Sequence, residues 1–240
     1  MTCSRYLLAA AIFAVSSFTL STAEAGSIGI GPFGDTLTAT SAAGATSSPF
    51  ALGYFGTAGV NDLVSTAPIA LSNGGTITFS PDLQAPQAGV YSGTVLGTVV
   101  SPFTKTSLTW SNYLAAQPSD NVTINLLAKT NTFSLLWGSV DKYNSLNLEF
   151  YYNNAWQKSL TVTGAQVKSA VDDDQFLANG TMSAFVTVED DSAHGFDTVI
   201  ATSTTSAFEF VPSVSVPEPA SAALLGAGLI GLGLRRRKAA

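Results

Sequence analysis

The chain has 240 residues, of which 11% are charged, and its formal net charge is −6. Between positions 26 and 216 it contains fourteen acidic residues, five lysines and no arginine. An acidic surface without guanidinium groups repels nucleic acid and anionic polysaccharide, which excludes a nucleic-acid-binding protein. Neutral glycans and divalent cations remain compatible with this charge, and the charge also suits solubility outside the cell.

The first 25 residues have the three parts of a secretory signal peptide. Arg5 gives the positive start, residues 7–18 are apolar, and Ala23 and Ala25 are the small residues that signal peptidase recognises. We predict a signal helix over 1–25, cleavage after Ala25 and export across the inner membrane. Cleavage would remove Cys3, the single cysteine, and would leave a mature chain without a disulfide or a thiolate ligand.

The next segment, 26–64, is rich in Gly, Ala, Ser and Thr and alternates only weakly, which predicts an N-terminal arm or the first strands. From 65 to 211, short segments alternate between apolar and polar residues, with turn-forming pairs between them. Such alternation is typical of strands with one buried face. The predicted strands are 76–79, 105–110, 122–126, 133–137, 146–150, 159–166, 183–188, 196–202 and 207–211. We therefore predict an all-β domain over 65–211, a jelly-roll-like antiparallel β-sandwich, with helices only at the two ends of the chain.

The segment around Trp137 has two interpretations. In the first, Trp137 ends a strand, while the side chains of Asp141 and Asn144 bond nearby backbone N–H groups in a turn. In the second, the segment belongs to a glycan-binding site, where aromatic rings stack on sugars and polar groups bind their hydroxyls. The ring faces would come from Trp137, Tyr143, Tyr151 and Trp156, and the polar groups from Asp141 and Asn144. We favour the turn and keep the glycan site as the alternative.

Two acidic runs, 172–174 and 189–191, are weak candidates for calcium binding, because calcium prefers several oxygen ligands. The candidate ligands are Asp172, Asp174, Asp190 and Asp191. Neither run has the Asp-x-Asp-x-Asp-Gly spacing of a calcium loop, and adjacent residues of an extended chain point in opposite directions. We therefore favour solvated loop charge and expect no metal and no cofactor.

Signatures of enzymes are scarce in the sequence. The single histidine, His194, falls in a predicted hairpin turn, and no Gly-x-Ser-x-Gly or His-Glu-x-x-His motif occurs. A carboxylate pair for glycoside cleavage could come from Asp141, Glu149 and Asp197, although any acidic protein offers such pairs. We expect a protein that is not an enzyme, with a secreted hydrolase as the less favoured alternative.

The last segment, 212–240, has the pattern of a membrane anchor. An uncharged apolar run, 220–234, follows a Pro-Glu-Pro tripeptide and precedes four cations. As a helix the run would be about 22 Å long at 1.5 Å per residue, which is shorter than the hydrocarbon layer. It would therefore span the membrane by thinning the bilayer or by snorkelling of its flanking residues. Cations at the end of such a helix stay in the cytoplasm, which places the preceding domain on the outer side. The tripeptide is Pro217, Glu218 and Pro219, and the cations are Arg235, Arg236, Arg237 and Lys238.

These tail residues together resemble the PEP-CTERM sorting signal of bacterial exported proteins. The resemblance implies that a membrane enzyme, an exosortase, recognises and removes the tail after export. It also implies a Gram-negative cell that makes extracellular polysaccharide and biofilm. It says nothing of the activity of the domain that precedes the tail.

A second resemblance lies within the predicted sandwich. The segment 136–144, Leu-Trp-Gly-Ser-Val-Asp-Lys-Tyr-Asn, and the following 148–151 resemble the "WGS.D.YN…l.fy" signature of a family of exosortase-dependent surface proteins. Segments 196–199 and 207–210 resemble the last two strands of that family. Val211 and Pro212 stand where relatives tend to have an Asp-Asn pair. The family implies no defined activity.

Together these patterns predict an exported protein that is anchored in the inner membrane, faces the periplasm, and then reaches the cell surface or the extracellular matrix. Its processing partners would be signal peptidase and an exosortase. The predicted role is structural or adhesive, in exopolysaccharide or biofilm, with contact to extracellular polysaccharide. A carbohydrate-binding module of the surface is the alternative.

Overall fold

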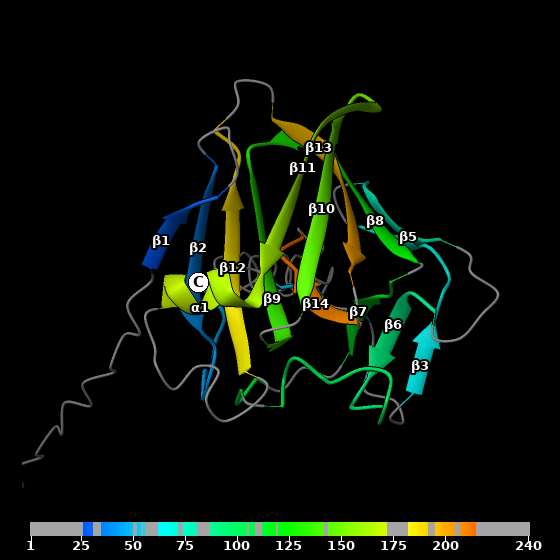
Figure 1. Ribbon diagram of the computed structural model, residues 1–240. Coiled ribbons are helices and arrows are strands. Elements are labelled where there is room, and N and C mark those ends of the chain that lie inside the picture. The colour runs from blue at the N-terminus through cyan, green and yellow to red at the C-terminus, as the bar shows by residue number, and fades with distance from the viewer. Residues whose placement is uncertain are drawn as a thin grey trace, which may run out of the picture.

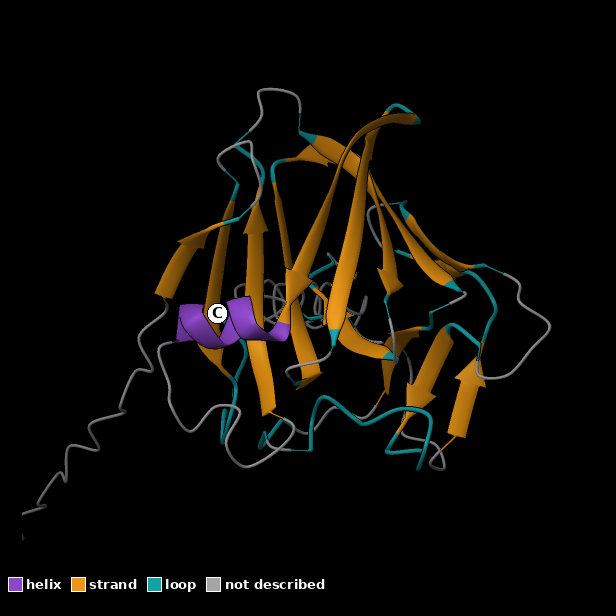
Figure 2. Ribbon diagram, in the orientation of Figure 1, coloured by secondary structure: helices purple, strands orange, loops and turns teal. Residues whose placement is uncertain are grey.

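The computed structural model describes residues 26–30, 35–49, 52–53, 55, 62–71, 74–80, 87–104, 106–108, 112–118, 120–141, 144–171, 182–191, 195–204 and 207–214. Within these ranges the chain forms two antiparallel sheets and one short helix (Figures 1 and 2), which confirms the predicted all-β class. The signal segment 1–25 and the tail from 215 lie outside the described residues. No helix within the described ranges is long and apolar enough to cross a membrane.

The larger sheet has eight strands in the order β1-β2-β12-β9-β14-β7-β6-β3. β1 and β2, from the Gly- and Thr-rich segment, are integral parts of it, since β2 pairs along its length with β12. In this order, the bounds of the strands are Gly26–Gly29, Thr36–Ser41, Met182–Glu189, Thr132–Val140, Phe208–Pro212, Asn112–Ala116, Gly89–Ser92 and Asp62–Ser65.

The smaller sheet has six strands in the order β11-β10-β13-β8-β5-β4. β10 and β11 form a hairpin whose turn residues, Asn153 and Asn154, have φ of 50° and 62°. Asn tolerates this left-handed conformation, which suits the twist of a two-residue hairpin turn. In the order given, the bounds of the strands are Ala155–Thr163, Ser145–Tyr152, Phe196–Ser203, Asn121–Thr130, Thr76–Phe79 and Ile69–Ala70.

The main core lies between the two sheets, where alternate residues of each strand meet. On β10, for example, Leu146, Leu148 and Phe150 point inward and are fully buried. Each such side chain contributes about 1.5–3 kcal/mol through burial. The largest fully buried side chains are Trp137, Tyr113, Phe133, Phe150, Phe196, Phe208 and Phe210.

A second apolar cluster covers the other face of the eight-stranded sheet. Leu136 and Val211 point to this side, and Leu52 and Phe103 from the connecting segments cover them. A backbone bond from the Gly53 N–H to the Pro212 carbonyl, 2.9 Å, holds one of these segments in place. β7 and β14 are therefore buried on both faces.

A helix, α1 (Gly164–Val171), corrects the prediction that helices occur only at the two ends. A capping box starts it: the Gln166 N–H donates to Oγ1 of Thr163 at 3.2 Å, and Oε1 of Gln166 accepts the Thr163 N–H at 2.8 Å. The predicted strand 159–166 accordingly ends at Thr163. The helix lies against β1 and β2, where it extends the layer of the six-stranded sheet (Figure 2).

The predicted strand 105–110 is also wrong over the residues that the structure describes there, 106–108, which lie outside any strand. The Thr106 N–H donates to the Phe103 carbonyl at 3.0 Å and closes a turn. Its hydroxyl accepts the Leu108 N–H at 3.3 Å, a local side-chain bond that competes with strand pairing.

Candidate functional site

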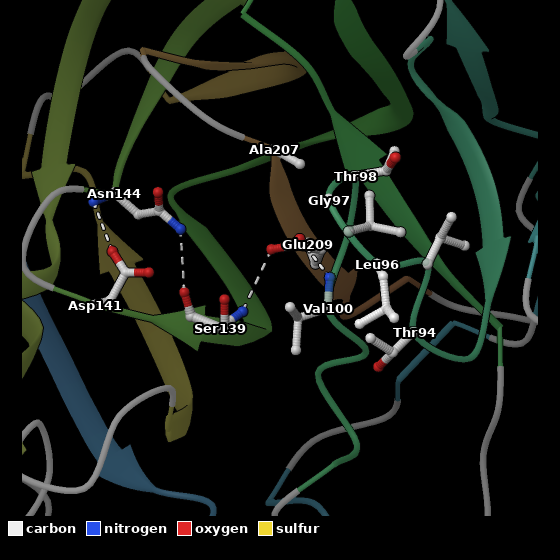
Figure 3. A pocket seen from close by; sticks show the side chains of 12 residues that line it. Thr94, Leu96, Gly97, Thr98, Val100, Ser139, Asp141, Asn144, Ala207 and Glu209 are labelled. Carbon is white, nitrogen blue, oxygen red and sulfur yellow. Dashed lines mark hydrogen bonds between the residues drawn. The ribbon is translucent and has the colours of Figure 1, made fainter.

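Glu209 is a buried acidic residue on β14, between Phe208 and Phe210, which point into the main core. Its side chain therefore points to the opposite face of the sheet, beneath the segment 94–100. Oε1 of Glu209 accepts the Val100 N–H at 2.8 Å, and Oε2 accepts the Ser139 N–H at 3.3 Å (Figure 3). The carboxyl group thus joins β14, the end of β9 and the covering segment.

Burial raises the pKa of Glu209 from 4.5 to about 8, and the charge of Asp141 adds to the rise. The two backbone N–H bonds lower this pKa but do not offset the cost of desolvation. The protonated carboxyl group therefore predominates at neutral pH. A neutral carboxyl group can donate a hydrogen bond as well as accept one.

A cavity of about 270 Å³ lies beside Glu209. It is polar on one side, with Ser139, Asp141 and Asn144, and is bounded on the other by the segment 94–100 (Figure 3). Leu96, at the tip of that segment, is 93% exposed. The size of the cavity suits a small polar ligand or ordered water.

Asn144 contributes an unpaired acceptor beside this cavity. Its backbone N–H donates to Oδ1 of Asp141 at 2.9 Å, and its Nδ2 donates to the Ser139 carbonyl at 3.2 Å. The residue is 4% exposed, and its Oδ1 has no hydrogen-bond partner among the described residues. An unpaired buried acceptor costs free energy, so a donor from water or a small ligand would be stabilised there.

Trp137 does not line this cavity, because its side chain points into the main core and is fully buried. Its ring centroid lies 4.9 Å from that of Phe208. Its proposed part in a glycan site is therefore wrong, since a ring without exposed surface cannot stack on a sugar. Of the first interpretation, the turn bond of Asp141 is confirmed, because its Oδ1 accepts the Asn144 N–H. The Asn144 side chain instead donates to a backbone carbonyl, and Trp137 lies within β9, which ends at Val140, so these two parts of the interpretation are wrong. Tyr143 lies outside the described residues.

Trp156, by contrast, is 59% exposed. It lies near the start of β11 and pairs with Tyr151 of β10. The Tyr151 hydroxyl donates to Oε2 of Glu149 at 2.8 Å, and this bond raises the pKa of the tyrosine. Two aromatic rings and a carboxylate thus occur together at one end of the six-stranded sheet.

Polar side chains continue along the outer face of this sheet. The central one is Asn147 of β10, whose Oδ1 accepts the Thr161 hydroxyl at 3.2 Å and whose Nδ2 donates to Oγ1 of Thr202 at 3.4 Å. Thr202 in turn pairs with Asn121 of β8. We call this surface the outer polar face, defined by Asn121, Asn147, Glu149, Tyr151, Trp156, Thr161 and Thr202.

The acidic calcium candidates do not form one site. Asp190 is 3% exposed and accepts a hydrogen bond from Nζ of Lys158 at 2.5 Å. The prediction of solvated loop charge is therefore wrong for this residue. Its carboxylate is already paired with the Lys158 side chain. Asp191 is exposed. Asp172 and Asp174 lie outside the described residues. Within the described ranges, no three His, Cys, Asp or Glu side chains come close enough to hold a metal ion.

The candidate hydrolase carboxylates also have separate structural partners. Asp141 lies beside the Glu209 cavity, and Glu149 lies on the outer polar face. Asp197 accepts the Asn153 N–H at 2.9 Å and so supports the hairpin turn between β10 and β11. His194 lies outside the described residues.

Sequence reasoning missed Glu209, Asp35 and Lys158. Glu209 stands within the Ala-Phe-Glu-Phe segment, where alternation places it opposite to the two core phenylalanines. Lys158, Leu160 and Val162 occupy every second position of β11, which indicates that Lys158 lies on the buried face of this strand. The alternation of these two segments indicates which face each side chain occupies, but it does not identify the residues that Glu209 and Lys158 contact.

In a comparison with known families, residues 215–238 match the PEP-CTERM protein-sorting motif. This confirms the sorting signal predicted from the Pro-Glu-Pro tripeptide, the apolar run and the basic end. The motif identifies an exported protein that is anchored transiently in the membrane and sorted to the cell surface through an exosortase. Comparisons with curated proteins and with solved structures gave no match.

Proposed function

We propose that the sorted protein is a structural or adhesive component of the extracellular polysaccharide matrix. The sorting motif at 215–238 carries the proposal, because it directs the domain to the surface where such a matrix is made. On this proposal the apolar run is a membrane helix with its cations in the cytoplasm, and the two-sheet domain faces the periplasm before release.

We also propose a jelly-roll-like topology for this domain. In its support, the strands from β8 to β14 repeatedly change sheets: β8, β10, β11 and β13 belong to the smaller sheet, and β9, β12 and β14 to the larger. Such crossing connections tie the sheets into one unit. A domain of this kind suits a matrix component that must keep its shape outside the cell.

The role in the matrix can be tested in a producing strain that lacks the chromosomal copy of the gene. Complementation with the full chain should restore biofilm cohesion, measured by rheology, and the protein should sediment with the polysaccharide. Complementation with the Glu218→Gln variant should restore less of both. Equal cohesion with and without the protein would overturn the structural role.

A second candidate function is binding of a neutral glycan, and the outer polar face favours it. Trp156 and Tyr151 supply ring faces, and Asn147 supplies an amide between two threonine hydroxyls. Sugar rings stack on aromatic faces, while amides and hydroxyls bind sugar hydroxyls. The excess of acidic residues favours a neutral glycan over an anionic one.

Affinity electrophoresis in gels that contain neutral or anionic polysaccharide tests this second function. The wild-type protein should be retarded by a neutral polysaccharide, and Trp156→Ala should lose most of the retardation. Leu127→Ala is the matched control, because Leu127 is a 63% exposed apolar residue on the same sheet. Equal retardation of all three proteins would remove Trp156 from any glycan site.

We propose no catalytic role. In support, both oxygens of Glu209 are held by backbone N–H groups, and Asp141 bonds the backbone of Asn144. Both carboxyl groups thus hold backbone N–H groups in place, which is a structural role. Turnover of a neutral polysaccharide by the purified wild-type protein, with loss of turnover in Glu209→Gln, would establish the hydrolase alternative instead.

A further inference from the structure

Lys158 is a buried lysine at the edge of the six-stranded sheet. It lies on β11 and is 6% exposed, and it shares the inward face of that strand with Leu160 and Val162. Phe150 pairs with it on β10, and Nζ of Lys158 lies 5.7 Å from the centroid of that ring. The amine is therefore held between the two sheets, away from water.

Two buried carboxyl groups from the other sheet meet this amine. Asp35 precedes β2 and Asp190 follows β12, and the two strands pair so that Thr36 lies opposite Glu189. Nζ of Lys158 contacts Oδ1 of Asp35 and lies 2.5 Å from Oδ1 of Asp190. Asp35 and Asp190 are 1% and 3% exposed.

As ions, these three groups form a costly arrangement. One ammonium faces two carboxylates, so one negative charge is in excess, and removing ions from water is expensive even when they are paired. Transfer of one proton from Lys158 to Asp35 leaves a neutral amine beside a neutral carboxylic acid. An amine and an acid held in contact also react far faster than the same groups free in solution.

We propose that Lys158 and Asp35 form an intramolecular isopeptide bond, with Asp190 as the general acid and base. The lone pair of the neutral Nζ attacks Cγ of Asp35, and Asp190 takes a proton from the nitrogen. Asp190 then gives this proton to the departing hydroxyl group. The Cγ–O bond breaks and one water molecule leaves, so an amide forms with no oxidation or reduction.

The bond would join the two sheets covalently. It would link the start of β2 in the eight-stranded sheet with β11, an end strand of the other sheet. It would close a loop between positions 35 and 158, which restricts the unfolded chain as a long disulfide loop does. The chain has a single cysteine and so cannot form an internal disulfide, which gives a cross-link of this kind a clear use in an exported domain.

Peptide mapping of the purified full chain tests the proposal directly. After denaturation and digestion, mass spectrometry should find one branched peptide that contains both Asp35 and Lys158 and is lighter than the sum of its parts by one water molecule. Recovery of Lys158 and Asp35 only in separate, linear peptides of ordinary mass would overturn it. A branch from Lys158 to Asp190 would overturn the assignment of Asp35.

Variants separate the chemistry from the packing. Asp190→Asn keeps the shape of the side chain but not its proton transfer, so the protein should fold and show little or none of the branched peptide. Full cross-linking in Asp190→Asn would overturn the role of Asp190. Lys129→Met, at an exposed lysine of β8, is the control and should retain the branch. Denatured wild type should also migrate faster in gels than Lys158→Met, because its chain holds a closed loop.

Discussion

Trp137 packs against Phe208 with their ring centroids 4.9 Å apart. The two residues belong to β9 and β14, so the contact joins two segments that lie far apart in the sequence. It places Ser139 and Glu209, on the same two strands, within hydrogen-bonding distance on the opposite face of the sheet. The core contact thus fixes the geometry of the Glu209 cavity.

Trp137→Ala should destabilise the domain by about 3–5 kcal/mol, because it leaves a large cavity in the core. Chemical denaturation monitored by circular dichroism measures this loss. Trp156→Ala removes the same side chain from an exposed position and should change the free energy of unfolding by about 0.5 kcal/mol or less. Equal losses for the two variants would contradict the placement of Trp137 in the core.

Glu209 should make stability fall as the pH rises. The folded state holds its pKa near 8, above the ordinary value of 4.5, so folding favours the protonated form. This contribution is complete below about pH 4.5 and is lost as the pH rises to about 8. The loss is at most about 5 kcal/mol at 1.36 kcal/mol per pKa unit. The free energy of unfolding of wild type and of Glu209→Gln is measured as a function of pH. Between about pH 4.5 and 8 it should change less with pH in Glu209→Gln than in wild type. Glu149→Gln, at a half-buried position, serves as the control.

Gly164→Ala should destabilise the start of α1. A Cβ at this position would lie 1.9 Å from the Asp141 carbonyl oxygen, so the backbone must shift, at a cost of about 1–3 kcal/mol. Gly29→Ala is the matched control, because a Cβ there meets no atom within 4 Å. Thermal unfolding should show a lower Tm for Gly164→Ala than for Gly29→Ala, and equal Tm values would contradict the close contact.

The fold class could be predicted from the sequence because alternation is a local signal. Leu146, Leu148 and Phe150 repeat every second residue and mark β10 without knowledge of its partners. α1 was missed because its capping box begins at Thr163, the last residue of β11, so the predicted strand was continued to Gln166. A capping box at the end of a strand is a local signal as well, and it was readable.

The site was less predictable, because its parts come from distant segments. Ser139 and Glu209 are 70 positions apart, and Lys158 and Asp35 are 123 apart. Their contacts depend on which strands pair, and alternation does not give that order. Trp137 is buried and Trp156 is exposed, since β9 is central in its sheet and β11 is at an edge.

The basic end of the tail should control retention in the membrane. Arg235, Arg236 and Arg237 changed together to Ser should leave the protein poorly retained or wrongly processed, because cations resist transfer across the bilayer. Fractionation into inner membrane, periplasm and medium, followed by immunoblotting, measures this. Unchanged fractionation and maturation would contradict the anchor.

The mass of the mature protein in cells with and without the exosortase tests the central claim most directly. With the enzyme present, the protein should lose the apolar and basic segment after Pro219 and leave the inner membrane. Without it, the protein should keep that segment and remain in the inner membrane. The same mass and the same fractionation in both strains would show that the motif at 215–238 does not direct sorting in this protein.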